Sequence, residues 1–179
     1  MKDTLVLYHS GCSDGFGAAW AAWKKLGTHA EYIPLRHQTR PDKALKNKHI
    51  YLLDITFSGK DMEWALQNCK SVTTLDHHAQ ALPFIKQATT YSFNVRKSGA
   101  TLAWAHFHPK EKIPRMLAHI EDMDLWRFSI PKTREVMAAL DAEPTDFKNW
   151  SRFSTNLEQG KSIVKIVEAG KTLLAYQTK

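Results

Sequence analysis

The sequence predicts an α/β fold, in which a mainly parallel β-sheet carries helices on both faces and a helical region follows at the C-terminus. Two patterns support this prediction. Short apolar runs that end in polar residues alternate with helical patterns through the first half of the chain, as in repeated strand–helix–strand units. Beyond Pro114 the pattern is helical. With 179 residues and 43% hydrophobic positions, the chain is long enough to bury one core.

The first elements follow from apolar spacing and from residues that favour helix ends. Residues 5–8 predict a buried strand, and residues 10–13 predict the turn after it. We expect the next helix to be capped by Asp14, to run over residues 16–26 and to end at Gly27. Three further apolar runs predict strands at residues 31–35, 50–54 and 72–75.

The later elements are mostly helices. A helix over residues 62–67, starting near residues 58–61, separates the third and fourth strands. A last strand is expected at residues 90–93, between helices over residues 84–87 and 98–107. The C-terminal pattern predicts helices over residues 116–123, 134–140 and 163–176.

The predicted domain boundary lies in the polar stretch of residues 151–160. Residues 1–150 would then form one domain, and residues 151–179 would form a C-terminal helical extension or the start of a linker.

Composition excludes several classes of protein. No apolar run approaches the ~18 residues of a membrane span, and the first run is too short for a signal peptide, so we expect no membrane partner and a cytoplasmic location. Two cysteines, Cys12 and Cys69, are too few for a disulfide framework or a zinc ribbon. The formal net charge of +7 favours an anionic partner, either a phosphorylated small molecule or a nucleic acid.

Side chains that bind metals follow three separate predicted strands. They are His9, Asp54 and the tripeptide Asp76-His77-His78, while Asp14 comes shortly after the first strand. Because the carboxyl ends of parallel strands share one edge of a sheet, we expect these side chains to converge there. Each of them taken singly has an ordinary structural explanation, such as a helix cap, and it is their joint placement that favours a site.

The donor types at this edge point to a divalent cation. Carboxylates mixed with imidazoles favour Mn²⁺, with Mg²⁺ or Co²⁺ as alternatives, and the number of candidate ligands is sufficient for two ions. Two cations about 3.5–4 Å apart are a known arrangement for displacement at phosphorus, because they activate water and neutralise the oxygens that gain charge.

Five segments resemble the DHH phosphoesterase superfamily. In the family's order they are residues 9–16 (HSGCSDGF), 52–54 (LLD), 75–78 (LDHH), 98–100 (SGA) and 121–126 (EDMDLW). The Asp-His-His triple is specific when the first motif precedes it at this distance, and the match extends from about residue 4 to about residue 150. Members of the superfamily include exonucleases on single-stranded DNA, oligoribonucleases, cyclic-dinucleotide phosphodiesterases and manganese pyrophosphatases.

The resemblance implies a set of metal ligands. His9 is expected to bind a first metal and Asp14 a second, with Asp54 bridging both. The second site would be completed by His77 and Asp124.

The resemblance also assigns roles to the residues around these ligands. Asp76 would orient the cluster through hydrogen bonds, and His78 resembles the histidine that contacts the scissile phosphate. Asp122 is the less favoured ligand, because the family pattern fixes the Asp that precedes the Leu-Trp pair. Many members have an aspartate, a first-metal ligand, where this chain has Cys12, so the Cys12 sulfur is either a metal ligand or a small group that packs the turn.

Substrate-binding residues are expected where the helix begins near residue 98. Backbone N–H groups at Ser98 and Gly99 could hold a phosphate, with Arg96 and Lys97 adding positive charge. A serine cap with neighbouring bases is also a common structural device. A second basic group consists of Arg36, Arg40, Lys43, Lys46 and Lys48. This second group would either steer a polyanion or form an ordinary solvated surface.

The function implied by the resemblance is two-metal, Mn²⁺-dependent hydrolysis of a phosphodiester in a short oligonucleotide or a nucleotide second messenger. A phosphomonoesterase or pyrophosphatase, and a nucleotide-binding module that has lost catalysis, are the alternatives. Two-domain relatives carry a second, substrate-gripping domain that this chain lacks up to Lys179, so we expect either a natural single-domain form or a fragment. A homodimer is compatible with the single-domain form and with the fragment.

Overall fold

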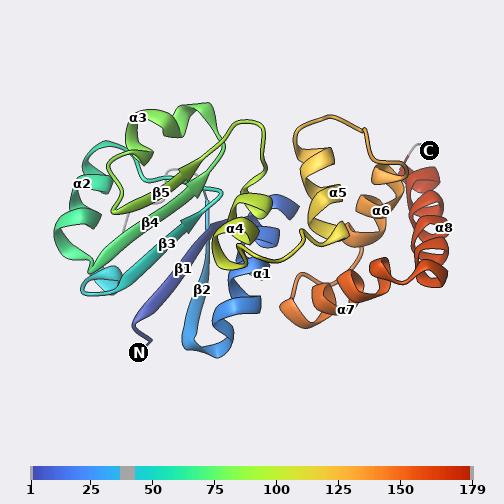
Figure 1. Ribbon diagram of the computed structural model, residues 1–179, viewed down its shortest axis with the longest axis horizontal. Helices are drawn as coiled ribbons and strands as arrows, with labels where there is room; N and C mark the ends of the chain where they lie inside the picture. Colours follow the sequence, from blue (N-terminus) through green and yellow to red (C-terminus); the bar gives the residue numbers. More distant parts are fainter. Residues whose placement is uncertain (1, 37–42, 178–179) are drawn as a thin grey trace. The chain divides into compact units, whose positions relative to one another are not determined.

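The computed structural model describes residues 2–36 and 43–177, which divide into two compact units, Met1–Glu111 and Lys112–Lys179. Figure 1 shows a β-sheet with helices in the first unit and helices alone in the second. The predicted α/β class with a helical C-terminal region is confirmed. Residue 150, where the sequence places the domain boundary, lies inside a helix of the second unit.

The first unit is built on five parallel strands. They are β1 (Thr4–His9), β2 (Ala30–Leu35), β3 (His49–Leu53), β4 (Ser71–Asp76) and β5 (Thr90–Phe93). Their order in the sheet is β2-β1-β3-β4-β5, and every neighbouring pair is parallel. The chain runs from β1 outward to β2 and then returns to the other side of β1 for β3. Ligands of open parallel sheets bind at the carboxyl ends of strands beside such a reversal.

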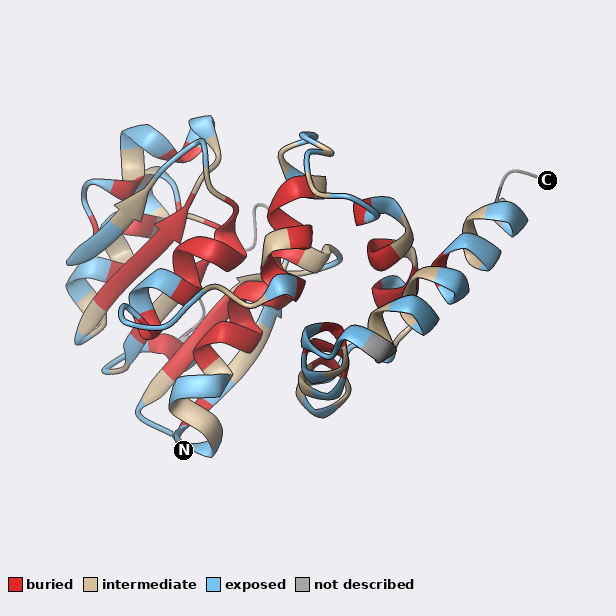
Figure 2. Ribbon diagram, turned by 45° about the vertical axis from the view of Figure 1, so that its right-hand side comes forward, coloured by how far each residue is buried: buried red, intermediate tan, exposed pale blue. Residues whose placement is uncertain are grey.

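Helices cover both faces of this sheet. On one face, α2 (Gly59–Asn68) contributes Met62 and Ala65 to a core with alternate strand residues. Those strand residues are Leu5, Leu7, Ile50, Leu52 and Val72. On the other face, α1 (Ser13–Leu26) packs against α4 (Gly99–Phe107), with the rings of Trp20 and Trp104 stacked at 5.6 Å. Figure 2 shows the resulting concentration of buried residues in the central strands and these helices.

The ends of α1 differ in part from the sequence prediction. Gly27 closes the helix with a φ of 52°, as predicted. The predicted cap, Asp14, is wrong, because the Cys12 sulfur accepts a hydrogen bond from the backbone N–H of Gly15 at 3.3 Å. The carboxylate of Asp14 has a partner elsewhere, in α4.

Short helices complete the first unit. They are the 3-10 turns η1 (Gly27–His29), η2 (Lys43–Leu45) and η3 (Ala79–Ala81), and the helix α3 (Leu82–Ile85). Helix α3 begins two residues before the range expected from the sequence.

The second unit contains α5 (Arg115–Asp124), α6 (Thr133–Asp141), α7 (Phe147–Glu158) and α8 (Gly160–Gln177). Helix α7 occupies most of the stretch predicted as a polar boundary. Asp146 caps α7, and its buried residues Trp150, Phe153 and Leu157 are spaced three and four apart, which is the period of an amphipathic helix. Within the parts of the chain that the structure describes, no helix is both long and apolar enough to cross a membrane.

Candidate metal centre

Polar side chains from three neighbouring strands meet at the carboxyl edge of the sheet. His9 ends β1, Asp54 directly follows β3, and Asp76 ends β4. Two groups of donor atoms form there, His9 with Cys12 and Asp54, and Asp54 with His77 and His78. Within each group, one donor atom per residue lies within 4.8 Å of the others. Asp54 belongs to both groups, as a carboxylate that bridges two ions would.

Asp54 is the centre of this arrangement. Its Oδ2 lies 3.4 Å from His9 Nδ1 and 3.6 Å from Cys12 Sγ, and its Oδ1 lies 3.2 Å from His77 Nε2. The residue is 1% exposed, and Oδ1 accepts no well-aligned hydrogen bond from the described residues. A buried carboxylate oxygen in this state is costly unless a further group binds it.

The backbone of Asp54 is in the left-handed region, with a φ of 58°. Few residues other than glycine adopt this conformation, although Asp and Asn tolerate it better than most. Such conformations are concentrated at functional sites, where the surrounding structure holds them in place. Here the peptide is held by a 2.9 Å hydrogen bond from Asp54 N to the carbonyl of Leu75 in β4.

The electrostatic surroundings keep Asp54 ionised. Burial alone would raise the pKa of this carboxyl, but its contacts with His77 and His9, together with the charge of His78, lower the pKa well below its usual range. A charged, acceptor-only group is therefore held inside the protein next to imidazoles, which is a donor environment suited to a divalent cation.

Two glycines, Gly15 and Gly99, allow the first turns of α1 and α4 to pack closely against the strand ends. A Cβ on Gly15 would lie 2.1 Å from the carbonyl oxygen of His9, and a Cβ on Gly99 would lie 2.6 Å from Cβ of Asp54 and 2.7 Å from its Oδ1. The first turns of α1 and α4 thus approach the strand ends so closely that any larger residue would displace the site.

Asp14 binds the N-terminus of α4. Its Oδ2 accepts a hydrogen bond from Gly99 N at 2.6 Å and its Oδ1 accepts one from Ala100 N at 2.9 Å, while His77 Nε2 lies 3.5 Å from Oδ2. The partial positive charge of a helix N-terminus stabilises a carboxylate in this position. Asp14 thereby joins α1 to α4 and also lies beside the candidate donor His77.

The contact between Asp14 and α4 occupies part of the phosphate site that the sequence predicts at the start of this helix. The backbone N–H groups of Gly99 and Ala100 already bind Asp14, and the fully buried Ser98 accepts a hydrogen bond from Thr101 N. A phosphate at these groups would have to displace Asp14. Substrate binding by Ser98, Gly99, Arg96 and Lys97 stays a prediction.

Asp76 fixes the orientation of the Asp-His-His segment. Its Oδ1 accepts hydrogen bonds from His77 N at 2.7 Å, His78 N at 3.0 Å and His78 Nδ1 at 2.8 Å. Its Oδ2 accepts one from Thr56 Oγ1 at 2.6 Å. Thr56 belongs to none of the motifs recognised in the sequence, although its place two residues after Asp54, in the loop that follows β3, is a usable signal.

His78 is the more accessible histidine of the pair, with 37% of its side chain exposed against 10% for His77. The hydrogen bond to Asp76 raises the pKa of His78, burial opposes this, and the charges of Asp54 and Asp76 add to the rise. A half-exposed imidazole with a raised pKa is suited to donate to an anionic oxygen.

Cys12 lies in the turn before α1, close to other candidate metal donors, and metal binding by its sulfur stays a prediction. Its sulfur caps α1 and also lies 3.2 Å from His9 Nδ1. Burial, and next the charge of Asp54, raise the pKa of this thiol to about 12. This rise favours the neutral thiol, whereas a cation bound at the sulfur would favour the thiolate.

Asp124 and Asp122 belong to the second unit. Asp124 is exposed at the end of α5, and metal binding by Asp124 stays a prediction. Asp122 is buried, and its carboxylate accepts hydrogen bonds from Ser129 N, Ser129 Oγ, Ile130 N and Thr133 Oγ1 over 2.6–3.2 Å. Burial would raise the pKa of Asp122, but the hydrogen bonds from Thr133 and Ser129 lower it. Asp122 therefore holds the connection between α5 and α6.

Asp122→Ala is expected to destabilise the protein by about 1–3 kcal/mol, because hydrogen-bond donors that now bind the carboxylate would lose their partner. Urea unfolding followed by circular dichroism measures the loss. Glu63→Ala, which removes an exposed carboxylate from α2, is the control and should unfold at nearly the wild-type midpoint. An unchanged midpoint for Asp122→Ala would show that this hydrogen-bonded turn contributes nothing to stability.

The second basic group predicted from the sequence is described only in part. Arg36 and Lys46 are exposed, and Lys48 Nζ donates a hydrogen bond to the carbonyl of Lys2 at 2.7 Å. Arg40 lies outside the described residues, as does the side chain of Lys43. Steering of a polyanion by this group stays a prediction.

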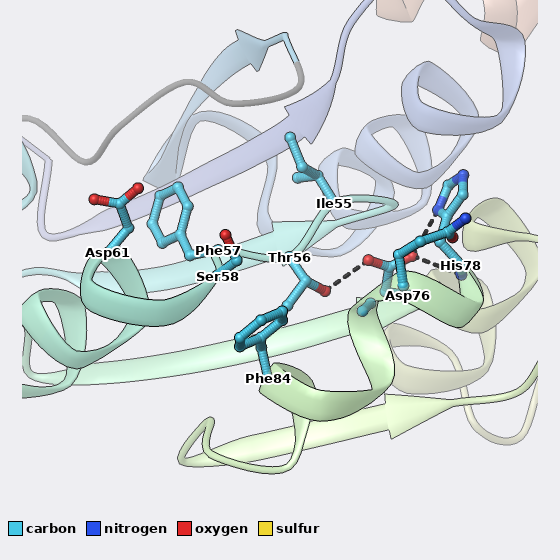
Figure 3. A pocket seen from close by; sticks show the side chains of 10 residues that line it. Ile55, Thr56, Phe57, Ser58, Asp61, Asp76, His78 and Phe84 are labelled. Carbon is cyan, nitrogen blue, oxygen red and sulfur yellow. Dashed lines mark hydrogen bonds and ion pairs between the residues drawn. The ribbon is translucent and has the colours of Figure 1, made fainter.

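A cavity of about 520 Å³ lies beside the donor cluster (Figure 3). The residues that line it are Ile55, Thr56, Phe57, Ser58, Asp61, Asp76, His78, Gln80, Ala81 and Phe84. They come from the loop after β3, the first turn of α2, and the segment from the end of β4 to α3. This cavity could not be predicted from the sequence, because its walls come from segments about twenty residues apart.

Comparisons with known proteins add the following. No family model matches the sequence. The uncharacterized protein R106 of Acanthamoeba polyphaga mimivirus is 30% identical over 190 residues, which cover 97% of this chain and 44% of the viral protein, so the chain spans less than half of that relative. An uncharacterized protein from Helicobacter pylori G27 has a similar fold in its crystal structure, with a TM-score of 0.68 and 12% identity over 97% of this chain and 62% of that one.

Proposed function

We propose that this chain is a metal-dependent phosphoesterase of the DHH type, which hydrolyses a phosphodiester in a short oligonucleotide or a nucleotide messenger. One observation carries the proposal: the buried Asp54 is shared by two groups of imidazole, carboxylate and thiol donors at the carboxyl edge of the sheet. The order and spacing of the DHH-like motifs along the chain support the same reading.

The donors present fit two divalent cations. His9, Cys12 and Asp54 would hold one, and Asp54 and His77, with Asp14 nearby, would hold the other. Mn²⁺ accepts this mixture of oxygen and nitrogen ligands, and the sulfur of Cys12 makes the first group softer than an all-oxygen site. Divalent cations bound at such a site lower the pKa of water and neutralise phosphate oxygens.

The side chains around the donors have separate tasks in this proposal. Asp76 holds the imidazole of His78 through Nδ1 and favours its protonated form. His78 then donates a hydrogen bond to an oxygen of the scissile phosphate, where negative charge grows as the bond to the leaving group breaks. Asp14 and Gly99 keep the helix ends and Asp54 in fixed positions.

The test is a substrate panel with purified protein. With Mn²⁺ we expect hydrolysis of dinucleotides or cyclic dinucleotides to nucleoside monophosphates, and with a chelator we expect none, because metal binding and activity depend on the same ligands. Products are separated by chromatography, and Mg²⁺, Co²⁺ and Zn²⁺ are compared with Mn²⁺.

Other outcomes of this panel would replace the proposal. Release of orthophosphate from pyrophosphate or from monoesters alone would indicate a pyrophosphatase or phosphomonoesterase. Nucleotide binding without any hydrolysis would indicate a binding module. Full phosphodiesterase activity in the presence of chelator would contradict the metal-dependent mechanism.

A further inference from the structure

The cavity beside the donor cluster has the dimensions and lining of a small-molecule site. Its volume of about 520 Å³ lies within the range of roughly 300–1,000 Å³ that ligand pockets occupy. Two of its lining residues, Asp76 and His78, belong to the Asp-His-His segment, so the cavity opens directly beside the donor cluster. A molecule whose phosphate lies at His78 would extend its remaining part into this space.

The walls of the cavity are suited to a flat, uncharged ring. Phe57, Ile55 and Ala81 are buried in the wall, and the ring of Phe84 is half-buried. Figure 3 shows the rings of Phe57 and Phe84 between Asp61 and the Asp76–His78 pair. Among the described residues that line the cavity there is no lysine or arginine, so away from His78 they offer mainly aromatic and apolar contact.

Polar groups of the cavity that lie away from His78 are placed to meet the edge of such a ring. They include Asp61 and Ser58 (Figure 3), and the carboxylate of Asp61 makes no hydrogen bond or ion pair with the described residues. An ionised carboxylate only accepts hydrogen bonds, so it favours a base with adjacent N–H donors on its edge. Guanine presents two such donors, N1–H and the 2-amino group. Adenine presents one amino group, and uracil flanks its single N–H with carbonyl oxygens that a carboxylate repels.

We propose that this cavity binds a guanine base, stacked against Phe84 with its N1–H and 2-amino edge on Asp61. The inference rests on the proposed function in placing the attached phosphate at His78, but base binding itself needs no hydrolysis. Asp61 is then a specificity-determining residue, and a guanine-containing phosphodiester is the preferred substrate class.

The binding experiment uses nucleosides, which lack a phosphate and so report on the cavity alone. Guanosine, adenosine, uridine and cytidine are titrated calorimetrically into the whole protein, in chelator and in Mn²⁺. We expect guanosine to bind at least about 10-fold more tightly than the others. Phe84→Ala and Asp61→Asn should each weaken guanosine binding by about 10-fold, through loss of the stack and of the carboxylate acceptor respectively.

Two exposed neighbours provide matched controls. Leu82→Ala lies on the same helix as Phe84, and Glu63→Gln lies on the same helix as Asp61, and neither residue lines the cavity. Both variants should bind guanosine as the wild type does. Asp61→Asn changes no volume, so it remains informative even if Phe84→Ala disturbs the fold.

The outcomes separate this inference from the proposed function. Hydrolysis of phosphodiesters without base preference, unaffected by Asp61→Asn and Phe84→Ala, would overturn guanine recognition and leave the phosphoesterase intact. Guanosine binding that both variants weaken, in a protein that hydrolyses no phosphodiester, would support the base site while the proposed function fails. Equal binding of all four nucleosides would overturn the role of Asp61.

Discussion

Asp54→Asn is expected to abolish Mn²⁺-dependent hydrolysis, with a loss of at least about 1,000-fold, and to remove most of the bound metal. Asp54 alone belongs to both donor groups, so its neutralisation removes a negative charge from both at once. Loss of several kcal/mol of charge stabilisation corresponds to a rate loss of this order. Initial rates and the metal content after dialysis measure the two effects.

The substitution should leave the fold intact, because Asn adopts a φ near 58° almost as readily as Asp does. Circular dichroism of the variant should match that of the wild type. Asp54→Ala should be less stable than Asp54→Asn, since alanine resists this backbone conformation by about 1–2 kcal/mol. Glu63→Gln, an exposed carboxylate in the same unit, serves as the activity control. Wild-type metal content in Asp54→Asn would refute a shared carboxylate.

Gly99→Ala is the second substitution with a large expected effect. The added Cβ would lie 2.6 Å from Cβ of Asp54 and 2.9 Å from its Cγ, which is closer than such atoms approach, so either Asp54 or the first turn of α4 must move. A shift of that turn also disturbs the hydrogen bonds from Gly99 N and Ala100 N to Asp14. We expect a destabilisation of about 1–3 kcal/mol and an activity loss of about 100-fold.

Gly160→Ala is the matched control for this prediction. Gly160 stands at the start of α8, and a Cβ there would meet no atom within 4 Å. Urea unfolding and kcat/KM of both variants, measured side by side, separate a general effect of adding a methyl group from the specific contact with Asp54. If Gly99→Ala retained wild-type kcat/KM, the position of Asp54 would not limit the reaction.

Most elements of the first unit follow from local patterns. All five strands lie within about one residue of the ranges that the sequence predicts. The pattern is clearest in the central strands β1 and β3, because a strand that is largely buried requires a nearly uninterrupted apolar segment. Helix α7 was not predicted, because it has no continuous apolar run. Residues 151–160 are mostly polar, and the apolar stripe of Trp150, Phe153 and Leu157 is recognised only when residues are counted at helical spacing.

The convergence of His9, Asp54 and the Asp76–His78 segment could also be predicted from the chain alone. Each of these residues stands at the end of an apolar run, and parallel strands bring such ends to one edge. The metal ligand set beyond this convergence rests on the resemblance to the DHH superfamily and stays a prediction.

Local spacing carries no information about which distant group satisfies a polar side chain. Asp14 has the sequence signature of a cap for its own helix, yet its carboxylate binds the N–H groups of α4, 85 residues away, and Cys12 takes the cap. The cavity between Asp61 and His78 likewise arises only when the loop after β3 packs beside α3. Hydrophobic periodicity encodes elements because it repeats within a few residues, whereas these pairings depend on how the elements pack and exist only in the folded chain.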